Sequence, residues 1–283
     1  MKVLVIGGTG NLGSKIIRSL LKRGHYVNLF DLPQADYNRI SKTNRINIFR
    51  GDINNSEDLE KACEDVDITV HLAAILPPHS ELDYEKTMLV NSRGTYNLLQ
   101  ALDATSSSPL IFASSVSVYG DTQEEDSPIA PSHPLNPTDN YSTSKIEAEK
   151  CIISSKIRYT ILRISGVYTA LPFEFPSPVQ FRPDQRIEFI DSKDVIQAFT
   201  NAVETKIERK IMNIAGGESW RMKGKNFVKE IYGAFGVRGD VNYPTKNGYF
   251  DWYENKESQN LLKYQNTTFS DFKIKLSNTF QNF

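Results

Sequence analysis

A tyrosine and a lysine four residues apart, Tyr141 and Lys145, open a stretch whose apolar spacing predicts a helix over residues 141–155. Four residues make about one helical turn, so the two side chains are expected to lie side by side. A cation held beside a phenol favours the phenolate and lowers the tyrosine pKa from its reference value of about 10. The pair therefore predicts a group that removes a proton from a substrate hydroxyl or returns it.

On its own, this spacing is typical of a solvated helix face, so the serines upstream of it decide the interpretation. Ser114 and Ser115 lie at the end of an apolar run that predicts a strand over residues 110–114. Doubly wound sheets bind their ligands at the carboxyl ends of their strands. A serine hydroxyl there can hydrogen-bond the substrate oxygen, and either serine fits this role.

A glycine turn near the N-terminus predicts a dinucleotide site. Gly7, Gly10 and Gly13 lie between an apolar strand and an amphipathic helix. Gly7 allows a tight turn, Gly10 lets the backbone approach a pyrophosphate, and Gly13 lets the helix pack on the strand. The N-terminus of the helix then presents unpaired N–H groups and a partial positive charge to the phosphates.

An acidic residue at the end of the second predicted strand selects the cofactor. Asp31 follows Gly13 by 18 residues, where a carboxylate accepts hydrogen bonds from the adenosine ribose and repels a 2′-phosphate. We therefore expect NAD rather than NADP. Asp52 and Ile53, just after the third predicted strand, are placed to meet the adenine.

The elements that must position these residues alternate between strands and helices. Because β-branched runs alternate with amphipathic stretches, we predict an α/β fold with a doubly wound parallel sheet. Asn11 and Ser56 are expected to act as N-caps, and Gly24 ends the first helix. The predicted strands are 2–6, 26–30, 46–50, 68–72, 110–114 and 159–164, and the predicted helices are 12–23, 57–64, 84–104 and 141–155.

The pattern changes after Ile164. Four prolines crowd a segment that cannot be regular helix or central strand, and we expect a substrate loop there: Pro172, Pro176, Pro178 and Pro183. A strand over 186–190, a helix over 192–204 and a strand over 211–214 follow. We predict a nucleotide-binding domain over 1–165 to which 191–215 returns, and a smaller C-terminal substrate-binding lobe made of 166–190 and 216–283, mostly helical after 222.

Composition excludes several classes of partner. The 283 residues carry 33 basic and 34 acidic side chains, so no overall field draws the chain to nucleic acid or to a membrane. Cys63 and Cys151 are the only cysteines, which argues against a disulfide framework or a metal cluster. The apolar run at the N-terminus stops at Gly7, too short for a signal peptide. We expect a cytoplasmic protein with a small-molecule substrate.

These motifs together resemble the extended short-chain dehydrogenases/reductases, the NAD-dependent epimerase/dehydratase family of nucleotide-sugar enzymes. The resemblance covers nearly the whole chain and implies a Rossmann-type sheet. Besides the glycine turn, Asp31, the serines and Tyr141/Lys145, the matching segments are Asp52-Ile53, His71-Leu-Ala-Ala74, Asn91-Ser-Arg-Gly-Thr95, Leu162-Arg163, Phe189-Ile-Asp191 with Asp194-Val195, and Asn213-Ile-Ala-Gly216.

The resemblance implies a role for each matching residue. Ser115 matches the catalytic serine, with Ser114 as the alternative; Tyr141 matches the general acid/base, and Lys145 the residue that holds the nicotinamide ribose and tunes the tyrosine. His71 reads as a buried strand residue. The residues that would bind the cofactor are Gly7, Gly10, Asn11, Leu12, Gly13, Asp31, Leu32, Asp52, Ile53, Leu72, Ala73, Ala74, Asn91, Tyr141 and Lys145.

Departures from the family pattern narrow the reaction. Sugar dehydratases of this type carry an Asp-Glu pair after the catalytic hydroxyl, because elimination of water needs its own acid and base; this chain has Val116-Ser117. Where epimerases carry an Asn that holds the diphosphate, it has Ser165-Gly166. Arg182 or Arg186 could replace that contact by a bidentate pair, although solvated loop arginines are the alternative. The expected substrate-binding residues are Ser115, Ser117, Tyr141, Arg182 and Arg186.

Three functions follow from this pattern. The first is an NAD-dependent nucleotide-sugar epimerase, which oxidises a sugar hydroxyl and re-reduces the ketone on its opposite face. The second is a one-way dehydrogenase or reductase of a small or hydrophobic alcohol or ketone. The third is a dinucleotide-binding sensor without catalysis, which the retained tyrosine and lysine disfavour. The resemblance also implies a homodimer that pairs the helices 84–104 and 141–155.

Overall fold

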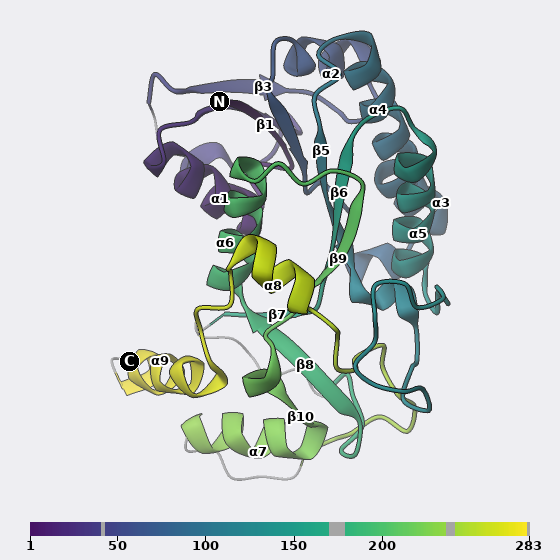
Figure 1. The fold of residues 1–283 in the computed structure, drawn as a ribbon, viewed down its shortest axis with the longest axis vertical. Coiled ribbons are helices and arrows are strands. Elements are labelled where there is room, and N and C mark those ends of the chain that lie inside the picture. Colours follow the sequence, from purple (N-terminus) through teal and green to yellow (C-terminus); the bar gives the residue numbers. More distant parts are fainter. Residues whose placement is uncertain (41–42, 170–178, 236–240, 282–283) are drawn as a thin grey trace.

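The computed structural model describes residues 1–40, 43–169, 179–235 and 241–281. Its centre is a seven-stranded parallel sheet in the order β3-β2-β1-β4-β5-β6-β9 (Figure 1). This confirms the predicted Rossmann-type α/β fold. The strands are β1 (Lys2–Ile6), β2 (Tyr26–Asp31), β3 (Ile46–Arg50), β4 (Ile68–His71), β5 (Leu110–Ser115), β6 (Tyr159–Ile164) and β9 (Lys210–Ile214).

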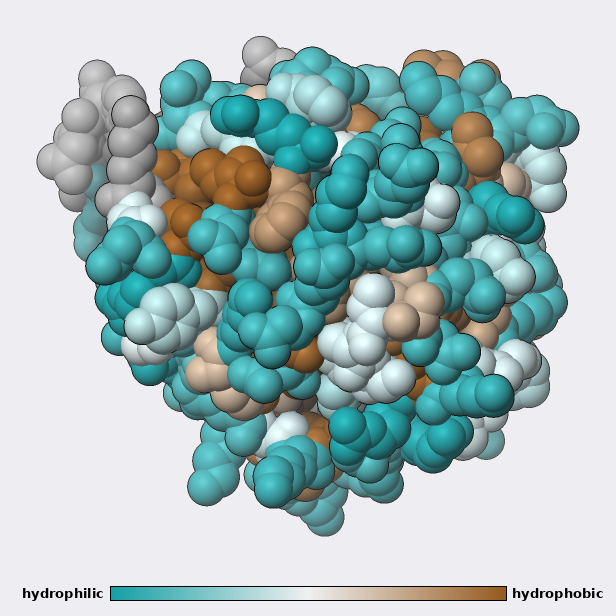
Figure 2. Space-filling model, turned by 90° about the horizontal axis from the view of Figure 1, so that it is seen from above, coloured by the Kyte–Doolittle hydropathy of each residue, from teal (hydrophilic) through white to brown (hydrophobic). Residues whose placement is uncertain are grey.

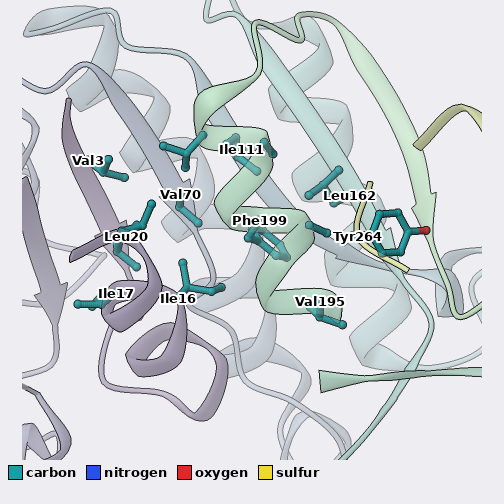
Figure 3. Packing of buried hydrophobic residues seen from close by; sticks show 14 of the residues in the cluster. Val3, Ile16, Ile17, Leu20, Val70, Ile111, Leu162, Val195, Phe199 and Tyr264 are labelled. Carbon is teal, nitrogen blue, oxygen red and sulfur yellow. The ribbon is translucent and has the colours of Figure 1, made fainter. Parts of the chain in front are cut away.

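Helices cover both faces of the sheet, as Figure 1 shows. On one face lie α1 (Asn11–Lys22) and α6 (Ser192–Glu204); on the other lie α2 (Ser56–Cys63), α4 (Gly94–Ala104) and α5 (Asn140–Ser154). Figure 3 shows apolar side chains of α1 and α6, among them Ile16 and Phe199, gathered over Val70 of the sheet. The apolar periodicity of these helices thus faces the core, which is why they form.

Three local predictions need correction. Gly10, rather than Asn11, is the N-cap of α1, and it has no side chain to cap with. Asn55, rather than Ser56, caps α2, and its side chain accepts hydrogen bonds from the first-turn N–H groups. The helix predicted over 84–104 is divided into α3 (Tyr84–Met88), a π turn at Leu89–Arg93 and α4. The π turn carries Asn91, which points inward to bond with other segments.

A second, smaller sheet has the order β10-β8-β7 and lies beyond the large one with α7 (Gly224–Phe235) and α9 (Phe269–Gln281) (Figure 1). It is formed by β7 (Gly166–Tyr168), β8 (Arg186–Asp191) and β10 (Arg221–Lys223). The helices predicted after residue 222 are present, whereas β7 and β10 were not predicted. Aromatic rings fill its core; those of Phe189 and Phe227 are 4.8 Å apart. Edge-to-face and tilted ring pairs of this kind add stability beyond the area they bury.

The C-terminal segment also contributes to the core that packs on the large sheet. After α7, the helix α8 (Lys256–Leu262) leads to Tyr264, and both Leu262 and Tyr264 belong to the core between the sheet and α6. The division into 1–165 with 191–215 and 166–190 with 216–283 stays a prediction. Of the expected substrate loop, Pro172, Pro176 and Pro178 lie outside the described residues.

Candidate active site

The strand order of the large sheet reverses between β1 and β4, and a doubly wound sheet binds its ligand at such a point. Gly7 follows β1 and has φ +81°, a conformation that side-chain-bearing residues rarely adopt. A Cβ on Gly7 would lie 2.7 Å from the nitrogen of Ala73, which follows β4. The glycine turn is therefore in contact with the segment Leu72–Ala74, which is half-buried.

The other two glycines shape the start of α1. A Cβ on Gly13 would collide with the carbonyl oxygen of Gly7 and lie 2.9 Å from Cα of Gly8, so the helix packs directly on the turn. A Cβ on Gly10 would lie 3.3 Å from the same carbonyl oxygen. The first turn of α1, which begins with Asn11 and Leu12, has no acidic residue to neutralise its positive end. The close packing of α1 on the glycine turn and the positive end of the helix fit the binding of a pyrophosphate.

Asp31 joins the turn to the end of β2. One carboxylate oxygen accepts hydrogen bonds from the backbone N–H of Thr9, at 2.9 Å, and from its hydroxyl, at 2.6 Å; the other accepts from Leu32 N–H at 2.9 Å. Carboxylate oxygens accept more than one hydrogen bond each, so Asp31 fits the ribose hydroxyls of NAD as well. The sequence analysis missed Thr9, which lies within the glycine turn itself.

Three of the residues expected to bind the cofactor differ in exposure. Asp52 is exposed, and its side chain accepts a hydrogen bond from the N–H of Asn54 at 2.9 Å. The side chain of Ile53 is buried against α4, where a Cβ on Gly94 would lie 2.7 Å from it. Leu32 is exposed at the end of β2. Of the three, Asp52 and Leu32 present side chains to the outside.

Asn91 is buried and uses its amide group within the protein. Its oxygen accepts from the N–H of Ile75 at 2.7 Å, and its nitrogen donates to the carbonyl of Ile75 at 3.0 Å and to the hydroxyl of Ser144 at 2.9 Å. Asn91 thus ties the segment after β4 to α5. The structure shows it linking two segments beside the site, and its contact with the cofactor stays a prediction.

Tyr141 and Lys145 lie on the buried face of α5, next to the end of β5. The ammonium of Lys145 donates to the carbonyl of Ala113 at 2.8 Å and lies 5.7 Å from the centre of the Tyr141 ring. Burial lowers the pKa of Lys145 to about 7, against the opposing charge of Glu149. Burial also raises the pKa of Tyr141, and a hydrogen bond with Ser115 opposes that shift.

The direction of the Tyr141 shift corrects the sequence-based expectation. A lysine one turn away was expected to lower the tyrosine pKa, but the phenol is buried, and removal from water disfavours the phenolate. Lys145 carries less positive charge than expected, because its pKa of about 7 leaves a fraction of the lysine unprotonated near neutral pH. In the protein alone, burial therefore sets the direction of both pKa shifts.

The structure separates the two candidate serines. Ser114 donates its hydroxyl to the carboxylate of Glu149 at 2.5 Å and is buried. Ser115 accepts hydrogen bonds from the N–H of Ser117 at 3.1 Å and from its hydroxyl at 2.9 Å, and its interaction with Tyr141 opposes the rise of the tyrosine pKa. Ser115 is therefore the serine on the side of the tyrosine. Ser117, expected to bind substrate, is fully buried and supports Ser115 instead.

The two arginines expected to hold a diphosphate are paired with carboxylates of the protein. Arg186 contacts both carboxylate oxygens of Asp251, at 2.7 and 2.9 Å, and donates to two carbonyl oxygens of the loop before α5. Arg182 is paired with Asp184 at 3.1 Å and is 40% exposed. A bidentate contact of Arg186 with substrate would require the buried Asp251 pair to break.

The sequence analysis missed two carboxylates beside α5. Glu81 accepts hydrogen bonds from the backbone N–H groups of Asn140 and Tyr141, at 3.0 and 3.2 Å, and so holds the start of the helix. Glu149 pairs with Arg163 inside the protein. Its position four residues after Lys145 was the signal that could have revealed it, because it places Tyr141, Lys145 and Glu149 on one helix face.

His71 is a buried residue of β4, as the sequence suggested. Burial, together with the charge of Lys145, lowers its pKa to about 3, so the ring is neutral. It contacts the hydroxyl of Thr95 at 3.0 Å, and that hydroxyl donates to the carbonyl of Asn91. His71 therefore donates from its Nε2–H and does not act as a base.

The fold and the site together define a dinucleotide-binding enzyme of the short-chain dehydrogenase/reductase type. Residues 3–182 match a family model described as the NAD dependent epimerase/dehydratase family, and the chain belongs to that family. NAD is the cofactor of the family, and the glycine turn and Asp31 fit it. Among the described residues, no three His, Cys, Asp or Glu side chains come together to hold a metal ion. No helix in the described ranges has the length and apolarity to span a membrane.

Relatives within the family differ in activity. The chain is 34% identical over 174 residues to a UDP-glucose 4-epimerase of Lactobacillus helveticus, which covers 59% of the chain and 52% of the relative. It is 33% identical over 156 residues to a human sterol-4-alpha-carboxylate 3-dehydrogenase (decarboxylating). This match covers 53% of the chain and 39% of the relative. The matches thus span about half or less of these relatives.

The fold is shared with solved structures. A UDP-glucuronic acid 4-epimerase from Bacillus cereus, in complex with UDP-glucuronic acid and NAD, superposes with a TM-score of 0.83 at 24% identity, covering 100% of this chain and 99% of that one. At this identity the comparison establishes the fold, and the choice of reaction depends on the residues of the site.

Proposed function

We propose that the chain is an NAD-dependent epimerase of a nucleotide sugar, with Ser115, Tyr141 and Lys145 as its catalytic residues. One observation carries the proposal: the buried Lys145 lies 5.7 Å from the centre of the Tyr141 ring and donates to Ala113 of β5, the strand that ends at Ser115. Bound NAD supplies reversible two-electron oxidation of an alcohol. Ser115 orients the substrate oxygen, and Tyr141 takes its proton and later returns it.

The residues after Ser115 support epimerisation over dehydration. Elimination of water needs an acid and a base beside the sugar, but Val116 and Ser117 are both fully buried. Neither is an acid or a base of ordinary strength. Tyr141 therefore remains as the acid/base of the proposed reaction, which suits proton removal and return at one oxygen.

A second candidate is a one-way NAD-dependent dehydrogenase or reductase of a small or hydrophobic alcohol or ketone. Two observations favour it. The Arg186 guanidinium is bound to Asp251, and the position of Gly166 leaves no room for a side chain, because a Cβ there would overlap the ring of Phe189. At Gly166 and at Arg186, a diphosphate contact is thus blocked by the protein itself.

One assay separates the candidates. With a catalytic amount of NAD, the purified protein is expected to interconvert UDP- or dTDP-linked hexose epimers, and chromatography measures this conversion. NADH, measured by its absorbance at roughly 340 nm, should not accumulate. Stoichiometric NADH formation with a panel of secondary alcohols would instead establish the dehydrogenase. Absence of both reactions, with NAD binding intact, would leave the non-catalytic sensor and contradict both enzyme functions.

We also propose that the protein is a homodimer formed through α3, α4 and α5. Large apolar side chains are exposed along these helices, including Leu89 at 50% and Ile153 at 43%, where a monomer would leave them in water. Hydrophilic residues predominate on the face shown in Figure 2, with hydrophobic residues only in patches. A two-fold pairing would cover the apolar side chains of both copies.

Light scattering tests the dimer. The wild-type protein is expected to have twice the mass of one chain, and Leu89→Arg to shift it to the monomer, because a charge would be buried in the interface. The matched control is Ile274→Arg on α9, where the isoleucine is 59% exposed and no pairing is proposed. A wild-type monomer at high concentration would contradict the dimer.

A further inference from the structure

The start of α5, the helix that carries Tyr141, is held by a side chain from another part of the chain. The first backbone N–H groups of a helix have no acceptor within the helix and need one from outside. Two of them, from Asn140 and Tyr141, donate to Glu81 at 3.0 and 3.2 Å, each to a different carboxylate oxygen. Glu81 precedes Asn140 by 59 residues, so this contact is tertiary and not a local cap.

The local cap of α5 serves the next two N–H groups. The carboxylate of Asp139 accepts from the N–H of Ser142 at 2.7 Å, and the N–H of Asp139 donates to the hydroxyl of Ser142 at 3.2 Å, which makes a capping box. The carbonyl of Asp139 accepts from the N–H of Thr143 at 3.1 Å. Glu81 thus supplies the acceptors for the N–H groups that precede those served by this cap.

Glu81 approaches α5 from a turn that is itself fixed. It ends the 3₁₀ turn His79–Glu81, and the hydroxyl of the buried Ser80 donates to its carboxylate at 2.8 Å. The carbonyl of Ser80 accepts from the hydroxyl of Thr87 in α3 at 2.9 Å and from the side-chain amide of Asn140 at 3.2 Å. The turn is therefore bonded to both helices, although the side chain of Glu81 lies at the surface.

The carbonyl of Tyr141 is held from the same direction as its N–H. Ser144 donates its hydroxyl to this carbonyl at 2.7 Å and accepts a hydrogen bond from Asn91 at 2.9 Å. Asn91 in turn bonds with the N–H and the carbonyl of Ile75, which follows β4. The segment after β4 thus reaches the backbone of Tyr141 twice, through Glu81 and through Asn91.

The same segment contacts the glycine turn. A Cβ on Gly7 would lie only 2.7 Å from the nitrogen of Ala73, two residues before Ile75. One stretch of chain therefore connects the glycine turn to the first turn of α5. The connection matters for catalysis, because displacement of a reacting group by about 1 Å can lower a rate by roughly a hundredfold.

We propose that Glu81 is a positioning residue, which sets where Tyr141 lies relative to the glycine turn by holding the first turn of α5. The proposal rests on the role proposed above for Tyr141 as the acid/base. Glu81 acts through the backbone of α5 and takes no part in the proton transfer itself. Its two carboxylate oxygens and their reach are what the role requires, rather than its charge.

Three variants separate reach from charge. Glu81→Ala removes both acceptors, and we expect kcat to fall roughly tenfold, a part of the loss that a displacement of about 1 Å can cause. Glu81→Asp keeps the charge but withdraws the carboxylate by one methylene group, so its kcat should be intermediate. Glu81→Gln removes the charge and keeps an acceptor oxygen at full reach. It should retain most of the wild-type kcat, because one amide oxygen can serve two N–H groups, as that of Asn55 does at the start of α2.

Two further measurements accompany the kinetics. The Kd of NAD should stay near its wild-type value in all three variants, because the glycine turn and Asp31 are unaltered. Amide hydrogen exchange, followed by NMR, requires no turnover. In Glu81→Ala, the N–H groups of Asn140 and Tyr141 should exchange roughly tenfold faster, as expected for the loss of an ordinary hydrogen bond. The N–H of Ser142, which Asp139 holds, should change less.

The matched control is Asp271→Ala. Asp271 accepts two hydrogen bonds at the start of α9, from the N–H of Thr268 at 3.0 Å and from its hydroxyl at 2.6 Å. Loss of these bonds should lower the melting temperature, as loss of Glu81 should, because both carboxylates stabilise the start of a helix. Since α9 carries no candidate catalytic residue, kcat should not change.

Two kinetic results would overturn the proposal. One is a folded Glu81→Ala variant with the wild-type kcat, which would leave Glu81 a merely structural residue. The other is a Glu81→Gln variant that loses as much kcat as Glu81→Ala, which would assign the effect to the charge. If Glu81→Ala does not fold, Glu81→Asp replaces it, and a wild-type kcat there would count equally against the proposal.

Failure of the proposed function gives a different result. It would appear as full activity in Tyr141→Phe, whatever the Glu81 variants show. The exchange rates of the Asn140 and Tyr141 amides would still decide whether Glu81 holds the first turn of α5. Unchanged exchange in Glu81→Ala would contradict that contact and with it the positioning role.

Discussion

Replacement of Tyr141 by phenylalanine is expected to lower kcat by about a thousandfold while NAD still binds. A positioned acid/base contributes roughly 10²–10⁴ to the rate, and Tyr141 is the buried phenol that lies beside Lys145 at the site. The ring fills the same space in the variant, so the fold and the cofactor pocket should be kept. Steady-state kinetics and NAD titration by fluorescence measure the two effects separately.

The control for this prediction is Tyr96→Phe on α4. Tyr96 is 40% exposed, and its ring lies 4.8 Å from the guanidinium of Arg93, a contact that phenylalanine retains. Loss of the Tyr96 hydroxyl in this variant should not change kcat. If Tyr141→Phe kept more than a tenth of the wild-type kcat, the assignment of Tyr141 as the acid/base would be wrong.

Replacement of Gly13 by alanine is expected to lower both the stability of the protein and its affinity for NAD. The added Cβ would collide with the carbonyl of Gly7 and crowd the backbone of Gly8, which cannot move aside as a flexible side chain can. Forcing an extra methyl group into a packed interior typically costs about 1–3 kcal/mol. The start of α1 would be pushed from the turn, and a distortion of that size corresponds to roughly a hundredfold loss of NAD affinity.

Thermal unfolding and NAD titration measure this prediction, and Gly233→Ala is its control. Gly233 lies within α7, and a Cβ there would have no atom within 4 Å. Alanine is favoured over glycine inside a helix by up to about 1 kcal/mol, so the control should be as stable as wild type or more stable. Wild-type NAD affinity in Gly13→Ala would show that the turn does not set the cofactor site.

Local sequence was sufficient for much of the fold. The alternation of apolar runs with amphipathic stretches predicted β1 through β6 within a residue at each end, because each element carries its own periodicity. The helix ends were less accurate. Asn55 and Ser56 both carry capping groups, and Gly10 precedes Asn11, so the sequence alone did not choose between neighbours.

The small sheet was the main omission in the fold. Its strands β7 and β10 have three residues each, too few for a period of two to stand out. They are held by pairing with β8 and by the aromatic core, which depend on residues distant in sequence. The helices predicted after residue 222 were correct, as α7, α8 and α9.

Sequence by itself determined which side chains could perform the chemistry: the glycine turn, Asp31, the serines, Tyr141 and Lys145 are recognisable because their spacing is local. Only the tertiary structure separated Ser115 from Ser114, through Glu149, and bound Arg186 to Asp251, a partner 65 residues away. It also reversed the expected shift of the Tyr141 pKa, because burial depends on everything packed around the phenol. Spacing places two groups side by side, whereas the surrounding fold decides their charge and their partners.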